Sequence, residues 1–237
     1  MQYKAKKWGD GDLTTNEAAR LGRVAENVAF NVLLNGSHML WMWEEIGYDY
    51  SINCDIDHPN AYNESYRCNK KPRPDALGKN YFTNANRVAA FTRCAQVITL
   101  RTQLIPEVFE GNPTSVDVGS GKALRKIQWG NDVFVAANFK VSGNEAVSLP
   151  SGTWYDYLDG GGKANSTYTL QPGEVKVFTG TKLEAPTFDD IQKRNPQGIE
   201  EMTIETPKTQ KILRDGQVFI LRGDKVYTIT GQVVNGK

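Results

Sequence analysis

Acidic and aromatic side chains gather between Glu44 and Tyr50, and they are the first candidates for chemistry. Glu44 and Glu45 are adjacent, and a Tyr-Asp-Tyr run follows them. A retaining glycosidase needs two carboxyls that flank one bond. Neighbouring residues of a strand point to opposite faces, so this pair is poorly placed for that task. We expect Glu45 to be a structural carboxylate at the rim of the fold.

The long polar stretch that follows is a candidate binding loop. Residues 49–80 are irregular and contain several tyrosines, and loops of this length are uncommon unless they are functional. Sugar rings stack on aromatic faces while their hydroxyls pair with polar groups. This pattern predicts substrate contacts at Tyr48, Asp49 and Tyr50. The alternative, in which the tyrosines only pin the loop to the rim, stays open.

The histidines and cysteines do not form a metal-ligand pattern. His38 begins an apolar run and is expected in the core, and His58 lies in an acidic loop that is weak evidence for a metal. The three cysteines lack Cys-x-x-Cys spacing, so we predict no metal site. Cys54 and Cys68 share one loop and are either bonded in an exported protein or unpaired. Cys94 is expected to be a core thiol.

A helix and an apolar run should position the acidic residues. Thr14 and Glu17 match the capping-box spacing before an apolar stripe, which predicts a helix over 16–34 closed by Asn35-Gly36. The run Met39–Trp43 is apolar at every position, which favours a strand covered on both faces, as in a parallel sheet. Helix, turn and strand together make half of a βαβ unit.

The spacing of apolar residues changes twice in the rest of the chain. A second helix is predicted from residue 81 or 84 to 104, ending before Pro106. Alternation after Pro113 predicts an antiparallel sandwich. Its expected strands are Ser115–Gly119, Leu124–Trp129, Val133–Phe139, Ala146–Leu149, Thr153–Tyr157, Ser166–Leu170 and Glu174–Phe178. A proline-containing linker over 181–209 and a small β tail over 210–237 follow.

Two of these stretches resemble a known family. Gly36–Gly47 resembles the last barrel strand of the α-amylase superfamily of glycoside hydrolases, and Val133–Phe139 with Gly152–Asp156 resembles the β-sandwich that follows that barrel. The resemblance covers about residues 1–180. It implies a fold of the α/β plus all-β class: residues 1–112 as the C-terminal remnant of a β/α (TIM) barrel, 113–180 as the sandwich, and a small hairpin tail.

The resemblance also implies where the catalytic residues lie. The family's Arg-x-Asp motif, separate acid and His-Asp pair are absent here, since the histidines precede Met39 and Pro59. The catalytic acids are therefore expected upstream of Met1. This implies the C-terminal portion of a retaining hydrolase of α-glucans such as starch, inactive alone and partnered by the missing part of the barrel. Calcium is possible in the parent enzyme. The alternative is a non-catalytic carbohydrate-binding or structural module that uses Trp154, Tyr155 and Tyr157 or the loop tyrosines.

Composition excludes some partners and suggests a location. Lys plus Arg number 28 against 27 Asp plus Glu, which offers no electrostatic case for nucleic acid. No apolar run approaches the roughly 20 residues of a membrane span, and the N-terminus has no signal-peptide pattern. The tail is similar to sorting or anchoring tails of exported proteins from Bacteroidetes-type bacteria. This resemblance implies an extracellular, cell-surface or periplasmic parent protein.

Overall fold

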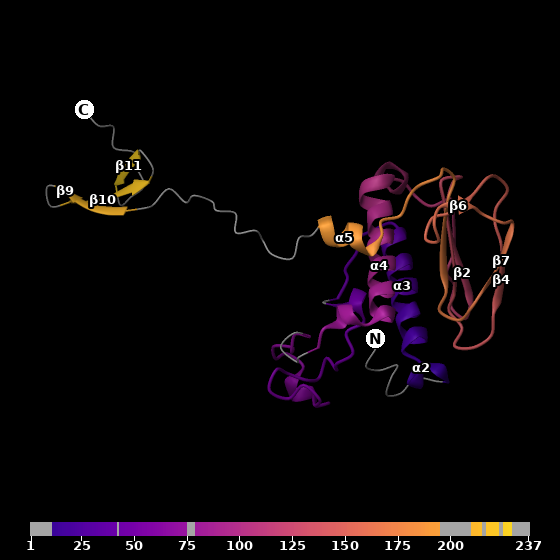
Figure 1. Ribbon diagram of the computed structural model, residues 1–237, viewed down its shortest axis with the longest axis horizontal. Coiled ribbons are helices and arrows are strands. Elements are labelled where there is room, and N and C mark those ends of the chain that lie inside the picture. The colour runs from indigo at the N-terminus through magenta and orange to yellow at the C-terminus, as the bar shows by residue number, and fades with distance from the viewer. Residues whose placement is uncertain are drawn as a thin grey trace. The chain divides into compact units, whose positions relative to one another are not determined.

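Two long helices, α3 (Glu17–Leu33) and α4 (Ala85–Thr99), run side by side in the same direction (Figure 1). Glu17 contacts Arg87 where both helices begin, and Arg101 donates to the carbonyl of Val32 where both end. The computed structural model describes residues 11–41, 43–74, 79–194, 210–214, 217–222 and 225–228. Residues up to Ile191 belong to one compact unit, and a second begins at Gln192.

The first helix begins with a different cap from the expected one. Asn16 Oδ1 accepts a hydrogen bond from the Ala19 amide at 3.1 Å, so Asn16 is the N-cap. The predicted capping box is wrong because Thr14 lies in the short helix α2 (Asp12–Thr15) and its hydroxyl donates to the Gly11 carbonyl. The extent of the helix is confirmed to within a residue at each end.

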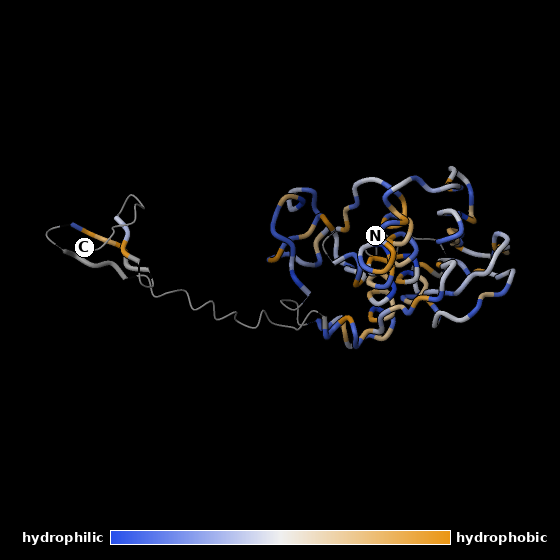
Figure 2. Tube along the Cα trace, turned by 90° about the horizontal axis from the view of Figure 1, so that it is seen from above, coloured by the Kyte–Doolittle hydropathy of each residue, from blue (hydrophilic) through white to orange (hydrophobic). Residues whose placement is uncertain are grey.

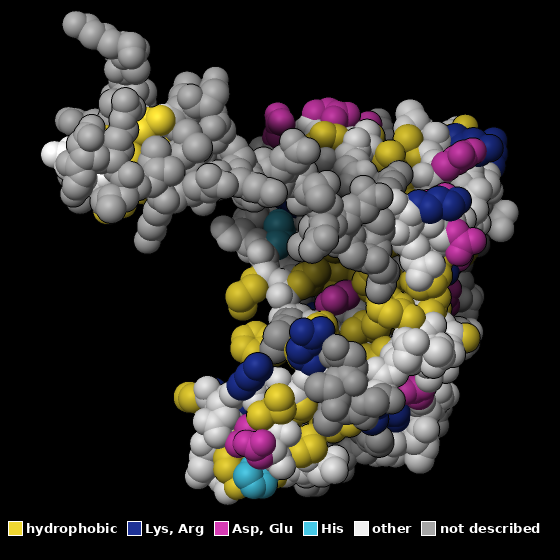
Figure 3. Space-filling model, turned by 60° about the vertical axis from the view of Figure 1, so that its left-hand side comes forward, with side chains coloured by type: hydrophobic (Ala, Val, Ile, Leu, Met, Phe, Trp, Pro, Cys, Tyr) yellow, Lys and Arg dark blue, Asp and Glu magenta, His cyan; other side chains and the backbone are white. Residues whose placement is uncertain are grey.

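The predicted buried strand Met39–Trp43 is wrong. Residues 37–41 belong to no helix or strand, Trp43 lies in a turn, and η1 (Glu44–Ile46) is a single 3-10 turn. The side chains of Met39 and Trp41 are 76% and 55% exposed. Hydrophobic side chains gather on one face of the first unit (Figure 3). A parallel strand needs a neighbouring strand to bond its backbone groups, and no described strand pairs with this segment.

The second helix begins and ends as predicted. Short 3-10 turns η2 (Glu64–Tyr66) and η4 (Tyr81–Thr83) precede it, and Asn84 caps it by accepting from the amides of Asn86 and Arg87. The helix continues into a π-helix, η5 (Leu100–Leu104), and a 3-10 turn, η6 (Pro106–Phe109). Pro106 ends the helical hydrogen bonding because it has no amide hydrogen.

The sandwich forms two antiparallel sheets. The larger has the order β1-β2-β3-β8-β5-β6 and the smaller pairs β4 with β7. The strands are β1 (Ser115–Asp117), β2 (Leu124–Trp129), β3 (Val133–Asn138), β4 (Glu145–Ser148), β5 (Tyr155–Asp156), β6 (Gly162–Lys163), β7 (Thr167–Leu170) and β8 (Val175–Thr179). All the predicted strands are present: β2 has the predicted bounds, β4 and β8 are shifted by one residue, and the others are shorter. Strand β6 is additional.

The large sheet is covered on both faces. Its central strand β3 is buried at every position. Val133 and Val135 belong to a core shared with α3 and α4, whereas Phe134 and Ala136 belong to a second core shared with β4 and β7. The result is three layers: a helix pair, a six-stranded sheet and a two-stranded sheet (Figures 1 and 2). One hydrophobic core joins the helices to the sheet. The domain boundary predicted near residue 113 therefore has no matching break in the core, and it remains a prediction.

Part of the predicted linker is folded. Leu183 and Ala185 pack against the first core, and Gln96 Nε2 donates to the Pro186 carbonyl at 3.0 Å. Thr187 immediately precedes helix α5 (Phe188–Arg194), and its amide and hydroxyl both donate to Asp190 Oδ2. Residues 195–209 of that linker lie outside the described part.

The second unit contains a three-stranded antiparallel sheet. β9 (Gln210–Arg214) and β11 (Lys225–Thr228) both pair with the central strand β10 (Gln217–Arg222). The turns predicted at residues 215–216 and 223–224 lie outside the described residues, and the sorting role of this tail remains a prediction. Within the described ranges, every helix is too short or too polar to cross a bilayer.

Candidate functional site

Arg87 holds the base of the candidate site, the rim loop, which we define as the described residues between Trp43 and Asn84. Arg87 lies in the first turn of α4 and is only 6% exposed. Its Nη1 donates to the carbonyls of Ile46 (3.1 Å) and Gly47 (2.6 Å). Its Nη2 donates to Glu17 Oε1 (3.1 Å) and Asp49 Oδ2 (3.3 Å). One buried guanidinium therefore joins both helices to the loop.

Asp49 is fully engaged in this arrangement. Its Oδ2 faces Arg87, and its Oδ1 accepts a hydrogen bond from the Tyr81 hydroxyl. The guanidinium of Arg87 also lies 3.9 Å from the centre of the Tyr81 ring. Burial, together with the adjacent Asp49 carboxylate, raises the pKa of Tyr81 well above its ordinary value. Asp49, one of the predicted binding residues, therefore links the rim loop to Arg87 and Tyr81.

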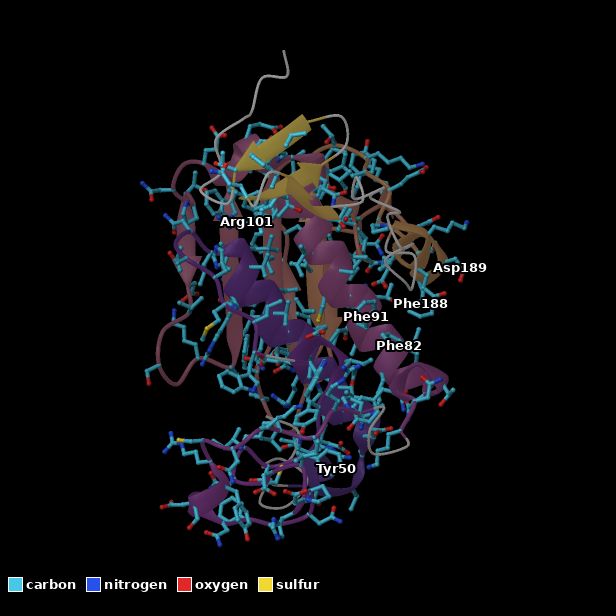
Figure 4. The ribbon with its side chains drawn as sticks, turned by 90° about the vertical axis from the view of Figure 1, so that its left-hand side faces the viewer. Tyr50, Phe82, Phe91, Arg101, Phe188 and Asp189 are labelled. Atoms are coloured by element: carbon cyan, nitrogen blue, oxygen red, sulfur yellow. The ribbon has the colours of Figure 1, made fainter. Side chains whose placement is uncertain are left out.

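The two predicted tyrosines form a row with Trp43. Ring centres of Trp43 and Tyr48 lie 5.2 Å apart, and those of Tyr48 and Tyr50 lie 5.6 Å apart. The Tyr48 hydroxyl donates to the Pro72 carbonyl at 2.8 Å, and burial raises the pKa of Tyr48. Lys79 Nζ lies 4.8 Å from the centre of the Tyr50 ring. Tyr50 lies in the loop, far from Arg101 at the other end of the helices (Figure 4).

A left-handed turn starts the rim loop. Trp43 has a φ of 59°, which a bulky residue adopts only when its surroundings fix it, and Gly47 follows with a φ of 71°. Between them, the 3-10 turn places the carbonyls of Ile46 and Gly47 within reach of Arg87. The turn and the arginine therefore act together to position the loop.

The adjacent glutamates have different surroundings. Glu44 Oε2 accepts from the Trp41 amide at 3.4 Å. Glu45 is half-buried, and burial, with a contribution from the charge of Glu44, raises its pKa. Burial raises the pKa of Cys94 as well, and the charges of Glu45 and Glu44 add to that effect, so this turn lies close to the middle of α4. The role of Glu45 as a structural rim carboxylate remains a prediction.

Asp55 organises the outer part of the loop. Its Oδ1 pairs with Nδ1 of His58 at 2.9 Å, and its Oδ2 accepts from Asn69 at 2.9 Å. These hydrogen bonds, first that of Asn69, lower the pKa of Asp55. The His58 ring stacks on Tyr66 with centres 4.6 Å apart. In the described part of the chain, no three His, Cys, Asp or Glu side chains are grouped closely enough to hold a metal.

The cysteines and the sandwich aromatics occupy clear positions. Cys54 is buried, Cys68 is exposed, and neither is in a disulfide. Trp154 is 3% exposed with its Nε1 donating to the Pro150 carbonyl, and Tyr157 is fully buried with its hydroxyl bonded to the Gln96 carbonyl. Their assignment to a sugar-binding surface is wrong, because their ring faces are used in the core. Tyr155 is partly exposed.

Sequence reasoning missed Arg87, Tyr81 and Glu17. The available signal was a charge on an apolar stripe: Arg87 precedes the buried residues Ala90 and Cys94 by three and seven positions, on the same helix face. A buried arginine needs several acceptors, but the sequence does not show which carbonyls provide them.

Known proteins offer a likeness in fold alone. No protein-family model matches the sequence, and no curated protein is significantly similar to it. The crystal structure of maltooligosyl trehalose synthase aligns with 71% of this chain at 16% identity and a TM-score of 0.50, over 23% of its own length.

Two other solved structures are similar over a comparable part of the chain. Trehalulose synthase MutB from Pseudomonas mesoacidophila MX-45 aligns over 75% of this chain and 41% of its own (13% identity, TM-score 0.47). An isomaltulose synthase variant from Erwinia rhapontici NX5, in complex with D-glucose, aligns over 75% and 40% (14% identity, TM-score 0.49). The described helices and sheet share the fold of the aligned part of maltooligosyl trehalose synthase, which is 23% of that protein.

Proposed function

We propose that this chain serves as the C-terminal portion of a larger enzyme of the α-amylase type that acts on α-glucans such as starch. In this proposal the portion supplies the last barrel unit, the rim loop and the sandwich, and the catalytic acids come from a preceding part of the parent protein. The fold likeness supports it, since the aligned region is 23% of maltooligosyl trehalose synthase.

The observation that carries the proposal is the segment Ser37–Trp41. It has no helical or strand hydrogen bonding, Leu40 packs against the helix core, and Met39 and Trp41 are exposed. No described residue bonds the backbone amides of His38, Met39 or Leu40. The Met39 carbonyl accepts from Asn31 Nδ2 at 3.0 Å, so the free groups are these amides. Free amides and alternating burial are expected of a strand whose neighbours are missing. A parallel neighbour in a barrel would bond this backbone and bury Met39 and Trp41.

The rim loop then lies where barrel enzymes hold their substrates. Loops that follow barrel strands form the active-site face. We propose that Tyr48 and Tyr50 contact the glucan with ring faces, and that Asp49 acts with Arg87 to hold them in place. Calcium in the parent enzyme, and export of the parent to the periplasm, cell surface or medium, also remain proposals, the latter resting on the resemblance of the tail to sorting tails.

The test compares this chain with a version extended through the coding sequence that precedes Met1. Reducing-sugar release from starch is expected only from the extended protein, whose added part should contain an Arg-x-Asp motif and a separate acid. Tyr50→Ala in the extended protein should raise KM more than it lowers kcat. Starch hydrolysis by the 237-residue chain alone would contradict the proposal.

The alternative, a binding module without catalysis, is favoured by one observation, the aromatic row of Trp43, Tyr48 and Tyr50. Sedimentation with insoluble starch separates the two. Retention of the 237-residue chain, lost in Tyr50→Ala and preserved in Tyr155→Ala, would favour the binding module.

A further inference from the structure

A cavity of about 270 Å³ opens between α3, α4 and two turns of the sandwich. It shares no residue with the rim loop. Ala18, Gly22 and Ala25 line it from α3, and Ala89 and Ala90 line it from α4. Small side chains at facing positions leave open space between two helices that larger residues would fill. The volume lies near the lower end of the range for small-molecule sites.

Glycines shape one wall of this cavity. The turn between β7 and β8 approaches α3 so closely that a Cβ on Gly22 would lie 3.2 Å from the Gly173 carbonyl oxygen. Gly173 itself has a φ of +79°, which favours glycine. Larger residues at these two positions would force the turn away from the helix, so the wall depends on both glycines.

Hydrogen-bond donors and acceptors surround the apolar floor of the cavity. Arg93 pairs with Asp159, and Asp159 also accepts from Lys176. Glu174 uses Oε2 to accept from the Gln171 amide at 2.8 Å and lines the cavity. Asn86, exposed at the other side, adds an amide with one donor and one acceptor.

The charges at the cavity argue against an anion. The positive charge of Arg93 is balanced by Asp159, and Glu174 adds a negative charge. A neutral molecule with several hydroxyls fits better, because each hydroxyl donates to a carboxylate or accepts from a guanidinium or amide. The Arg93 side chain is one-third exposed, so part of its guanidinium is accessible beside its pairing with Asp159.

We propose that this cavity binds a small neutral polyhydroxylated molecule of about the size of one hexose. The apolar floor contacts the C–H face of the ligand, and the groups of Asn86, Arg93 and Glu174 bond its hydroxyls. No aromatic side chain is among the lining residues, so affinity is expected in the millimolar range, as is usual for ligands of so few atoms. The proposal does not depend on the proposed function.

The experiment is a titration of the ¹⁵N-labelled full chain with glucose, followed by NMR. Saturable shifts of the Gly22 and Gly173 amides are expected. Ala89→Leu places a bulky side chain in the cavity at an exposed helix position that tolerates leucine, and it should weaken binding at least tenfold. Ala85→Leu is the matched control, because Ala85 is exposed on the same helix and does not line the cavity.

Each outcome decides the proposal. Saturable glucose shifts that Ala89→Leu abolishes and Ala85→Leu preserves would support it. Absence of saturable shifts with glucose and with glycerol would overturn it, as would equal binding by Ala89→Leu. Sodium phosphate or acetate that binds as tightly as glucose would show an anion site and would overturn it as well.

Discussion

The sandwich and the rim loop are held together by different physics. The central strand β3 is buried on both faces and hydrogen-bonded on both edges, so its stability comes from apolar contacts and a complete backbone ladder. The rim loop has little apolar core, and its base depends on one buried arginine with carbonyl and carboxylate acceptors. Damage to the first should unfold the whole unit, whereas damage to the second should release the loop alone.

The largest expected effect is a cavity in the sandwich core. Phe178 is fully buried and packs on Phe134 and Tyr168. Phe178→Ala should lower the free energy of unfolding by about 3–5 kcal/mol, measured by urea denaturation. Phe82→Ala, at a 36% exposed position, is the control and should cost far less. If Phe178→Ala disordered only one strand, the expectation that damage to the sandwich unfolds the whole unit would be wrong.

Removal of the guanidinium tests the rim loop. Arg87→Met should cost about 2 kcal/mol, because buried carbonyls lose their donor while Glu17, one-third exposed, keeps water as a partner. Hydrogen exchange should accelerate in residues 44–50 and stay slow in β3. Arg87→Lys should restore part of the protection, and equal acceleration in both regions would contradict the proposed separation.

A buried acid in α3 should make stability depend on pH. Glu26 of α3 is fully buried, its carboxylate oxygens have no hydrogen-bond partner in the described part, and burial raises its pKa to about 8 despite the charges of Arg23 and Arg125. The raised pKa favours the protonated folded form, so its contribution is complete below about pH 4.5 and is lost as pH rises through about 8.

Glu26→Gln should remove this dependence. At pH 9 the variant should be more stable than the wild type by about 2 kcal/mol, and below pH 4 the two should be similar. Thermal melts at several pH values provide the measurement, with Glu174→Gln as the control at a partly exposed site. Parallel pH profiles for wild type and Glu26→Gln would contradict the assignment.

The smallest expected effect is the loss of one hydrogen bond in the rim loop. Tyr81→Phe removes the donor to Asp49 but keeps the ring under Arg87. We expect a cost of about 1 kcal/mol and faster exchange limited to the loop. An effect as large as that of Arg87→Met would mean that the Tyr81 hydroxyl, rather than the guanidinium, dominates the loop.

The sequence predicted these two regions unequally. Alternation and turn residues indicated every strand from β1 to β8 except the two-residue β6, because both signals are local. The apolar run Met39–Trp43 was predicted to be a strand covered on both faces, but the strand covered on both faces is β3. Whether a strand is covered depends on the elements packed against it, which a short apolar run does not reveal. Substrate contact by Tyr48 and Tyr50 remains a prediction, and the sequence did not reveal that Arg87, 40 residues after Gly47, holds the base of their loop.

The last carbonyl groups of α3 have side-chain hydrogen-bond donors. Carbonyl oxygens of three successive residues accept from side chains: those of Val32 and Leu34 from Arg101 Nη1 at 2.7 Å, and that of Leu33 from Trp129 Nε1 at 2.9 Å. Helix ends ordinarily fray because such oxygens lack donors, and here the guanidinium also meets the negative pole of the helix dipole. The last turn of α3 should therefore stay closed, with slow amide exchange, even though the chain that follows it at Met39 and Trp41 is exposed.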